Sequence, residues 1–145
     1  MATVELRFSA LPEHVRTARL VAAAVARRAG VDEAVLDEVR LAVGEACTRA
    51  VGLHQSGGIS APVQVLLIEE EKQFSIEVGD EAPRSIPGDR ASGAPGEEPD
   101  AETEEDEMGL AVISGLVDDV EVTAGEHGGQ IRMTWPTTPP AATLP

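Results

Sequence analysis

Two oppositely charged residues, Glu45 and Arg49, lie four positions apart in a stretch whose apolar residues recur at helical spacing. This order favours an ion pair on the helix surface, which would occupy a carboxylate that could otherwise accept a proton. From the residues alone, a solvated helix carboxylate is the better interpretation of Glu45. A second carboxylate, Asp80, follows a predicted strand, where aspartate commonly begins a turn.

The other residues capable of chemistry form no recognisable site. His14, His54 and His127 have no metal-ligand spacing among themselves or with the single cysteine, and we expect all three in turns or on the surface. Cys47 falls on an apolar-periodic helix, which favours a buried thiol over a nucleophile. The acidic run 97–107 lacks the spacing of an EF-hand, and there is no Walker-type glycine loop. We therefore expect no metal site.

Length and composition limit the class of protein. The chain has 145 residues, a net charge of −15 and only 2% aromatic residues, so we expect one domain with an aliphatic core. The acidity argues against direct nucleic-acid binding, which depends on basic residues that neutralise phosphates. No apolar run reaches the roughly 20 residues of a membrane span. There is no signal-peptide pattern and no possible intramolecular disulfide, so we expect a cytoplasmic protein without membrane contact.

Hydrophobic periodicity predicts a strand, two helices, a hairpin, a long loop, a helix and a second hairpin. The first helix starts at residues 9–12 and stops at Gly30, and the second follows the cap residue Asp32 and ends by 55–58. The predicted strands are residues 4–8, 63–68, 73–79, 120–123 and 130–135. This order predicts an α/β two-layer sandwich with a mixed, largely antiparallel sheet covered on one face by helices.

Two segments carry the composition of flexible chain. Residues 81–107 are rich in Pro, Gly, Ser and acidic residues, so we expect a flexible acidic loop that leads into a buried helix at 108–117. Residues 136–145 are expected to form a disordered tail. The remaining chain, residues 1–135, is then a single domain.

Several motifs resemble one known family. The stretch 36–51 (LDEVRLAVGEACTRAV) resembles the N box of the histidine-kinase-like ATPases, with its closest match in the anti-sigma-factor serine kinases. Residues 76–80 (IEVGD) resemble the strand that delivers an adenine-contacting aspartate. A loop in the lid position follows, and 108–120 (MGLAVISGLVDDV) resembles the exit of that lid into a buried helix. The resemblance runs through most of residues 1–135 and implies the histidine-kinase-like ATPase fold.

The resemblance also implies roles for single residues. Glu45 matches the general base that activates the attacking hydroxyl, and Asp80 matches the aspartate that contacts adenine. Arg49 occupies the place of a Mg²⁺-binding asparagine, yet arginine has no acceptor atom and cannot ligate a cation. It could instead bind phosphate directly. Ala82 replaces a glycine that allows close approach of the ligand.

The resemblance places a phosphate-binding Gly-x-Gly at a helix start over residues 107–109. Met108 and Gly109 keep two of these positions. Glu107 replaces the first glycine, so it would either repel phosphate or cap a helix that begins at Met108. A Gly-Thr pair of the last strand falls on Gly129 or Gln130, so we expect that adenine contact to be lost.

We therefore predict an anti-sigma-factor-like regulator of bacterial type that acts by partner switching. Its partners would be a sigma factor, a STAS-type anti-anti-sigma protein or both, and the resemblance implies a homodimer. ATP binding is expected to be impaired, with no cofactor required. The alternative is an active serine kinase that uses ATP and Mg²⁺ to phosphorylate an anti-anti-sigma factor. A third possibility is a pocket in which Arg49 holds another anionic ligand.

Overall fold

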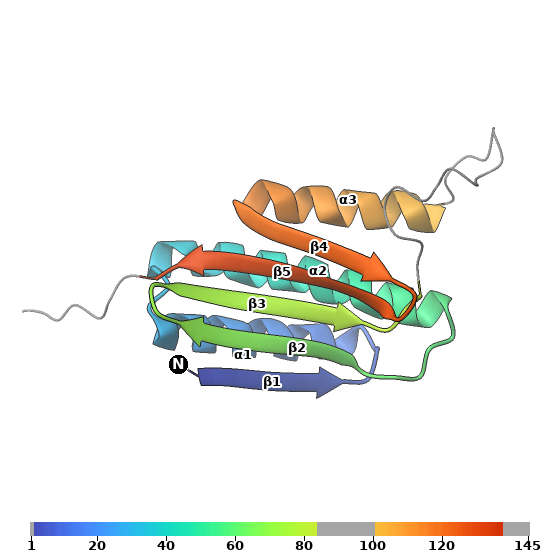
Figure 1. The fold of residues 1–145 in the computed structure, drawn as a ribbon, viewed down its shortest axis with the longest axis horizontal. Helices are drawn as coiled ribbons and strands as arrows, with labels where there is room; N and C mark the ends of the chain where they lie inside the picture. Colours follow the sequence, from blue (N-terminus) through green and yellow to red (C-terminus); the bar gives the residue numbers. More distant parts are fainter. Residues whose placement is uncertain (1, 84–100, 138–145) are drawn as a thin grey trace, which may run out of the picture.

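The structure is a computed structural model that describes residues 2–83 and 101–137, with side chains described for 2–83 and 108–137. Its helices and strands form two layers, with every helix on the same face of one sheet (Figure 1), which confirms the predicted sandwich. In chain order the elements are β1 (Ala2–Phe8), α1 (Glu13–Ala29), the 3₁₀ turn η1 (Glu33–Val35), α2 (Leu36–Ser56), β2 (Val63–Glu70), β3 (Gln73–Asp80), α3 (Ala101–Leu116), β4 (Asp119–Gly125) and β5 (Gly128–Pro136).

The strands lie in the order β1-β2-β3-β5-β4, so β3 is the central strand. All four pairings between the described strands are antiparallel, and the sheet is therefore not mixed as predicted. Parallel neighbours would need a crossover connection, whereas here tight turns join β2 to β3 and β4 to β5. β3 is paired on both sides from Gln73 to Gly79, and its last residue, Asp80, pairs with β5 alone.

One face of the sheet is apolar and packs against the helices. Alternate residues of the three inner strands are buried there: Val63, Val65, Leu67, Phe74, Ile76, Val78, Ile131, Met133 and Trp135. Helix α2 supplies the opposite side of this core with Leu36, Val39, Ala42, Val43, Ala46, Cys47, Ala50 and Val51. Full burial of one large apolar side chain contributes about 1.5–3 kcal/mol, so this seam holds the two layers together.

The helix ends follow local signals. α1 ends at Gly30, whose φ of 101° places it in the left-handed region that glycine adopts without strain. The Asp32 side chain then accepts a hydrogen bond from the Ala34 amide at 2.9 Å and starts η1, which leads directly into α2. None of the described helices is long and apolar enough to cross a membrane.

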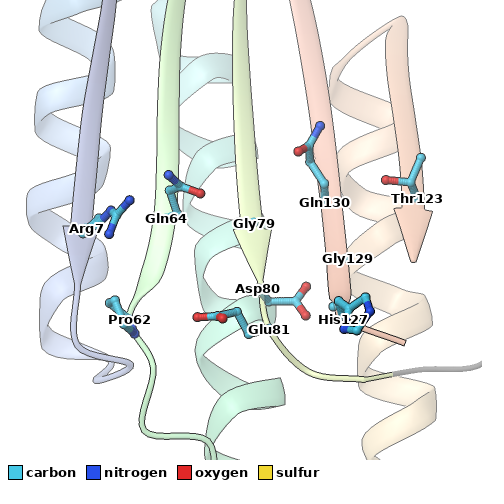
Figure 2. Close-up of a pocket in the computed structure, with 11 residues that line it drawn as sticks. Arg7, Pro62, Gln64, Gly79, Asp80, Glu81, Thr123, His127, Gly129 and Gln130 are labelled. Carbon is cyan, nitrogen blue, oxygen red and sulfur yellow. The ribbon is translucent and has the colours of Figure 1, made fainter. Parts of the chain in front are cut away.

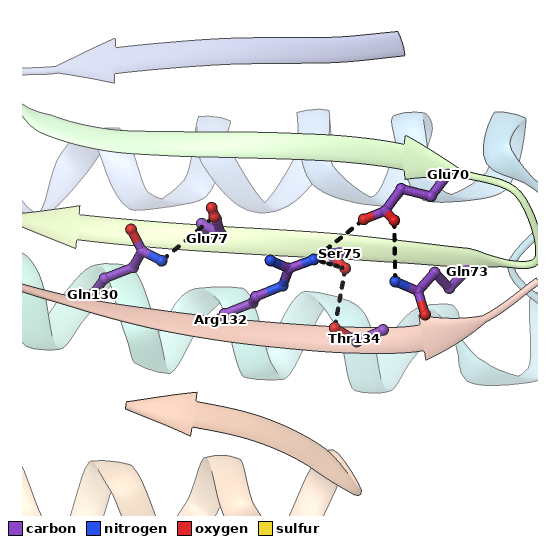
Figure 3. A network of polar contacts seen from close by, with 7 residues as sticks. All are labelled: Glu70, Gln73, Ser75, Glu77, Gln130, Arg132 and Thr134. Atoms are coloured by element: carbon purple, nitrogen blue, oxygen red, sulfur yellow. Dashed lines mark hydrogen bonds and ion pairs between the residues drawn. The ribbon is translucent and has the colours of Figure 1, made fainter. Parts of the chain in front are cut away.

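The other face of the sheet is polar and carries a network of side chains (Figure 3). Arg132 bonds to Glu70 at 3.2 Å and to the hydroxyl of Ser75 at 3.5 Å, and Ser75 lies 3.0 Å from the hydroxyl of Thr134. The Arg132 and Glu70 side chains are about one-third exposed, so this ion pair contributes about 1 kcal/mol or less. The network occupies a face that no described helix covers.

The third helix begins earlier than predicted. α3 starts at Ala101, seven residues before the expected start at Met108, so the acidic segment 101–107 is helical and the predicted loop is wrong over these residues. Glutamate is a good helix former, and acidic residues in the first turns interact favourably with the helix dipole. Residues 84–100 of the predicted loop and 138–145 of the predicted tail lie outside the described residues.

The turn between β4 and β5 packs tightly against the end of β3. Gly128 has a φ of 120°, and a Cβ atom built on it would lie 2.0 Å from the Asp80 carbonyl oxygen and 2.7 Å from the Glu81 Cα. Both neighbours are backbone atoms that cannot rotate away. Only glycine is compatible with this position.

We predict that Gly128→Ala destabilises the protein by about 2–4 kcal/mol, because it combines a strained φ with a backbone clash. Gly125→Ala is the matched control, since it lies in the same hairpin with open space around its Cβ position. It should change the unfolding free energy by no more than about 0.5 kcal/mol. Urea unfolding of both variants measures the difference, and equal stabilities would contradict the packing described.

The buried thiol gives a second prediction. Burial raises the pKa of Cys47 from 9.0 to about 12, so at pH 8 the folded protein should hold about a thousandfold less thiolate than the unfolded chain. Labelling with dithionitrobenzoate should be slow in buffer and fast in guanidinium chloride. The linked stability is fully present below pH 9 and is lost as the pH rises towards 12. Rapid labelling in buffer would show that the thiol is accessible.

Candidate functional site

Asp80 is the last residue of β3 and lies at the end of the central strand. It is 7% exposed, and its Oδ1 accepts a hydrogen bond from the Ala82 amide at 3.0 Å. Across the sheet it pairs with Gly129, one of the two residues on which the adenine-contacting Gly-Thr pair of the resemblance falls. The structure therefore brings Asp80, Ala82 and Gly129 together at one corner.

His54 belongs to the same corner, although the sequence interpretation placed it on the surface or in a turn. That expectation is wrong, because His54 is 0% exposed in the last turn of α2. Its Nε2 accepts a hydrogen bond from the Glu81 amide at 2.8 Å, so Nδ1 carries the proton and donates to the Ala61 carbonyl oxygen at 2.9 Å. The available signal was its spacing, since His54 follows Cys47 by seven residues on the buried stripe of α2.

Glu45 lies in the middle of α2 on the side that faces α3. It is half-buried, and its Oε2 lies 3.7 Å from the position that a Cβ on Gly109 would take. Residues 64 positions apart in the sequence are thus adjacent in the fold. The structure brings together the expected base and the expected phosphate-side glycine.

Arg49 is also half-buried, one turn further along α2. The ion pairs between described side chains join Arg7 to Glu5, Arg27 to Glu33, Arg40 to Asp37 and Arg132 to Glu70. The predicted pair of Glu45 with Arg49 is not among them. Arg49 takes part in other interactions, and the Glu45 carboxylate faces α3.

Met108 and Gly109 lie inside α3, about two turns after its start. Only the first four amides of a helix lack a partner within it. The resemblance placed these two residues at a helix N-terminus. In the structure their backbone amides lie inside the helix instead. What Gly109 provides instead is a surface without a side chain opposite Glu45.

A cavity of about 510 Å³ lies at the Asp80 end of the sheet (Figure 2). Polar side chains from β1, β2 and β5, namely Arg7, Gln64 and Gln130, line it together with the chain at Asp80 and Glu81 at the end of β3. Thr123 of β4, which pairs with Gln130, also lines it. Glu45, Arg49 and Gly109 are not among its lining residues. Of the predicted site residues, Asp80 therefore lines the cavity, whereas Glu45 and Gly109 meet between α2 and α3.

No group of three His, Cys, Asp or Glu among the described side chains is placed to hold a metal ion. Arg49 offers donors only, whereas Mg²⁺ requires oxygen ligands. Of Glu45 and Arg49, only Glu45 carries an acceptor oxygen on its side chain.

A comparison with known protein families gives a match over nearly the whole described chain. Residues 8–135 match the model of the histidine kinase-like ATPase domain. This range includes Glu45, Arg49, Asp80 and Gly109. It agrees with the antiparallel sheet and one-sided helical layer described above.

Individual relatives agree with this assignment. The chain is 31% identical over 137 residues to the serine-protein kinase RsbW of Bacillus pumilus, covering 90% of this chain and 83% of the relative. It is 29% identical over 135 residues to RsbW of Oceanobacillus iheyensis, covering 90% and 84%. Among solved structures, the RsbU and RsbW domains of Rv1364c from Mycobacterium tuberculosis match with a TM-score of 0.65 at 16% identity, over 92% of this chain and 31% of that longer one. This chain therefore belongs to the histidine kinase-like ATPase domain family.

Proposed function

We propose that this protein is a cytoplasmic anti-sigma-factor-like regulator that works by partner switching and has an impaired ATP site. Its partners are a sigma factor, a STAS-type anti-anti-sigma protein or both, and it acts as a homodimer. Membership of the family and the two RsbW relatives support the regulatory part. The proposal that the ATP site is impaired rests on one observation: Arg49 lies on the same helix as Glu45.

Arg49 opposes metal-assisted phosphoryl transfer in two ways. It removes an oxygen ligand where the resemblance implies one, and it adds a permanent positive charge one helical turn from Glu45. A magnesium ion would meet this charge in a half-buried setting, where repulsion is screened less than at the surface. Stabilisation by metal ions is a dominant part of phosphoryl transfer, so its loss disfavours kinase activity.

The alternative function is that of an active serine protein kinase. It is favoured by the position of Glu45, whose carboxylate faces Gly109 without an ion pair to Arg49. It is also favoured by the two relatives, both of which are named serine-protein kinases. In this case Arg49 would bind a phosphate oxygen directly and take over part of the role of the metal.

Calorimetry separates these functions. We expect no measurable heat when the wild type is titrated with ADP or ATP in Mg²⁺, and we expect Arg49→Asn to strengthen Mg²⁺-dependent binding by about tenfold or more, which is about 1.4 kcal/mol. Arg40→Asn is the control, since it makes the same change on α2 at a residue paired with Asp37. Micromolar, Mg²⁺-dependent binding by the wild type would exclude the impaired site. Binding that persists in EDTA would assign Arg49 to the phosphates.

Partner switching gives an independent prediction. The purified chain should form a complex with a sigma factor or a STAS-type protein encoded in its own genome, with the same affinity in the presence and absence of ATP and Mg²⁺. Size-exclusion chromatography with light scattering measures the complex and the expected homodimer. Transfer of labelled phosphate from ATP to a partner serine, abolished by Glu45→Gln, would establish the kinase instead.

A further inference from the structure

The peptide group between Asp80 and Glu81 is held on both sides. Its N–H donates to His54 Nε2 at 2.8 Å, and its C=O packs against the backbone of Gly128. Because a peptide group is planar, fixing both of its ends fixes the direction in which the chain leaves β3. The side chain that accepts the hydrogen bond from this N–H, His54, is 0% exposed.

The same peptide controls the Asp80 carboxylate. Asp80 Oδ1 accepts from the Ala82 amide at 3.0 Å, so the side chain and the next two residues form a small hydrogen-bonded turn. If the Asp80–Glu81 peptide rotated, the Ala82 amide would move and this turn would open. The bond from Glu81 to His54 therefore supports one of the contacts that orient the carboxylate.

His54 is in turn held by α2 and by the segment before β2. Its Nδ1–H donates to the Ala61 carbonyl oxygen at 2.9 Å, so the ring cannot turn without losing a buried bond. The ring lies on the helix that also carries Glu45. One helix thus bears both the candidate base and the group that holds the Asp80 corner.

We propose that His54 is a positioning residue for Asp80, acting as a neutral imidazole that fixes the peptide after β3. This names what orients the aspartate in the proposed site, and its relevance to ligand binding rests on the proposed function. An alternative is a purely structural role, in which His54 only fills the core and satisfies Ala61. The two bonds of the ring can be separated to distinguish these roles.

Two substitutions separate them. In His54→Asn the amide nitrogen takes the place of Nδ1 and can donate to Ala61, but nothing remains to accept from Glu81. In His54→Gln the amide oxygen takes the place of Nε2 and can accept from Glu81, while the bond to Ala61 is lost. Each variant loses one buried hydrogen bond, so a purely structural role predicts similar effects from both.

Amide hydrogen exchange of the full chain, followed by NMR, is the test. In His54→Asn we expect the Glu81 and Ala82 amides to exchange about tenfold faster relative to Val78 in the middle of the sheet, because one buried bond is lost. In His54→Gln their exchange relative to Val78 should stay within about twofold of the wild type. A ¹⁵N spectrum of the wild-type ring should show Nε2 without a proton.

Three results would overturn the proposal: equal acceleration in the two variants, a fast Glu81 with an unchanged Ala82, or a protonated Nε2. If both variants unfold, the ring spectrum and the exchange of Glu81 and Ala82 in the wild type still decide. None of these measurements needs a nucleotide or a partner. If the exchange results contradict the role of His54, the proposed function is unaffected. If calorimetry contradicts the impaired ATP site, the role of His54 is unaffected.

Discussion

Burial of the inner faces of β2, β3 and β5 against α2 is the interaction on which the candidate site depends. α2 presents an apolar stripe to the sheet along its whole length, and this contact sets both its height above the sheet and its rotation. Glu45 and His54 then take their positions from helical geometry alone. Glu45 faces α3, and His54 reaches the end of β3. If the seam loosened, both groups would move together.

The two parts of the site are held with different stiffness. The Asp80 corner is fixed by main-chain contacts, from the pairing with Gly129 to the close approach of Gly128. Glu45 instead meets Gly109 through a flexible side chain at a helix–helix contact. The Asp80 corner is therefore the more rigid part, and the contact between Glu45 and α3 is the more adaptable one.

Much of the fold could be predicted because local patterns determine it. Alternation gave the strands, and Gly30 and Asp32 gave the break between α1 and α2. The start of α3 was missed because a run of glutamates has both the composition of a flexible loop and a high helix propensity. His54 was missed because its polar type was weighted above its spacing. The contact of Glu45 with α3 depends on tertiary packing, which no local pattern records.

The different burial of two polar residues on α2 has a consequence for how this protein can evolve. Arg49 is only half-buried, so a change between asparagine and arginine alters a charge while part of the side chain stays at the surface. His54 is fully enclosed with both ring nitrogens bonded, so a change there leaves backbone groups unsatisfied. If partner recognition alone were selected, as the proposed function implies, substitutions should be tolerated more readily at the first position than at the second. A change at His54 would thus be felt first in folding, and a change at Arg49 first in the charge that α2 carries.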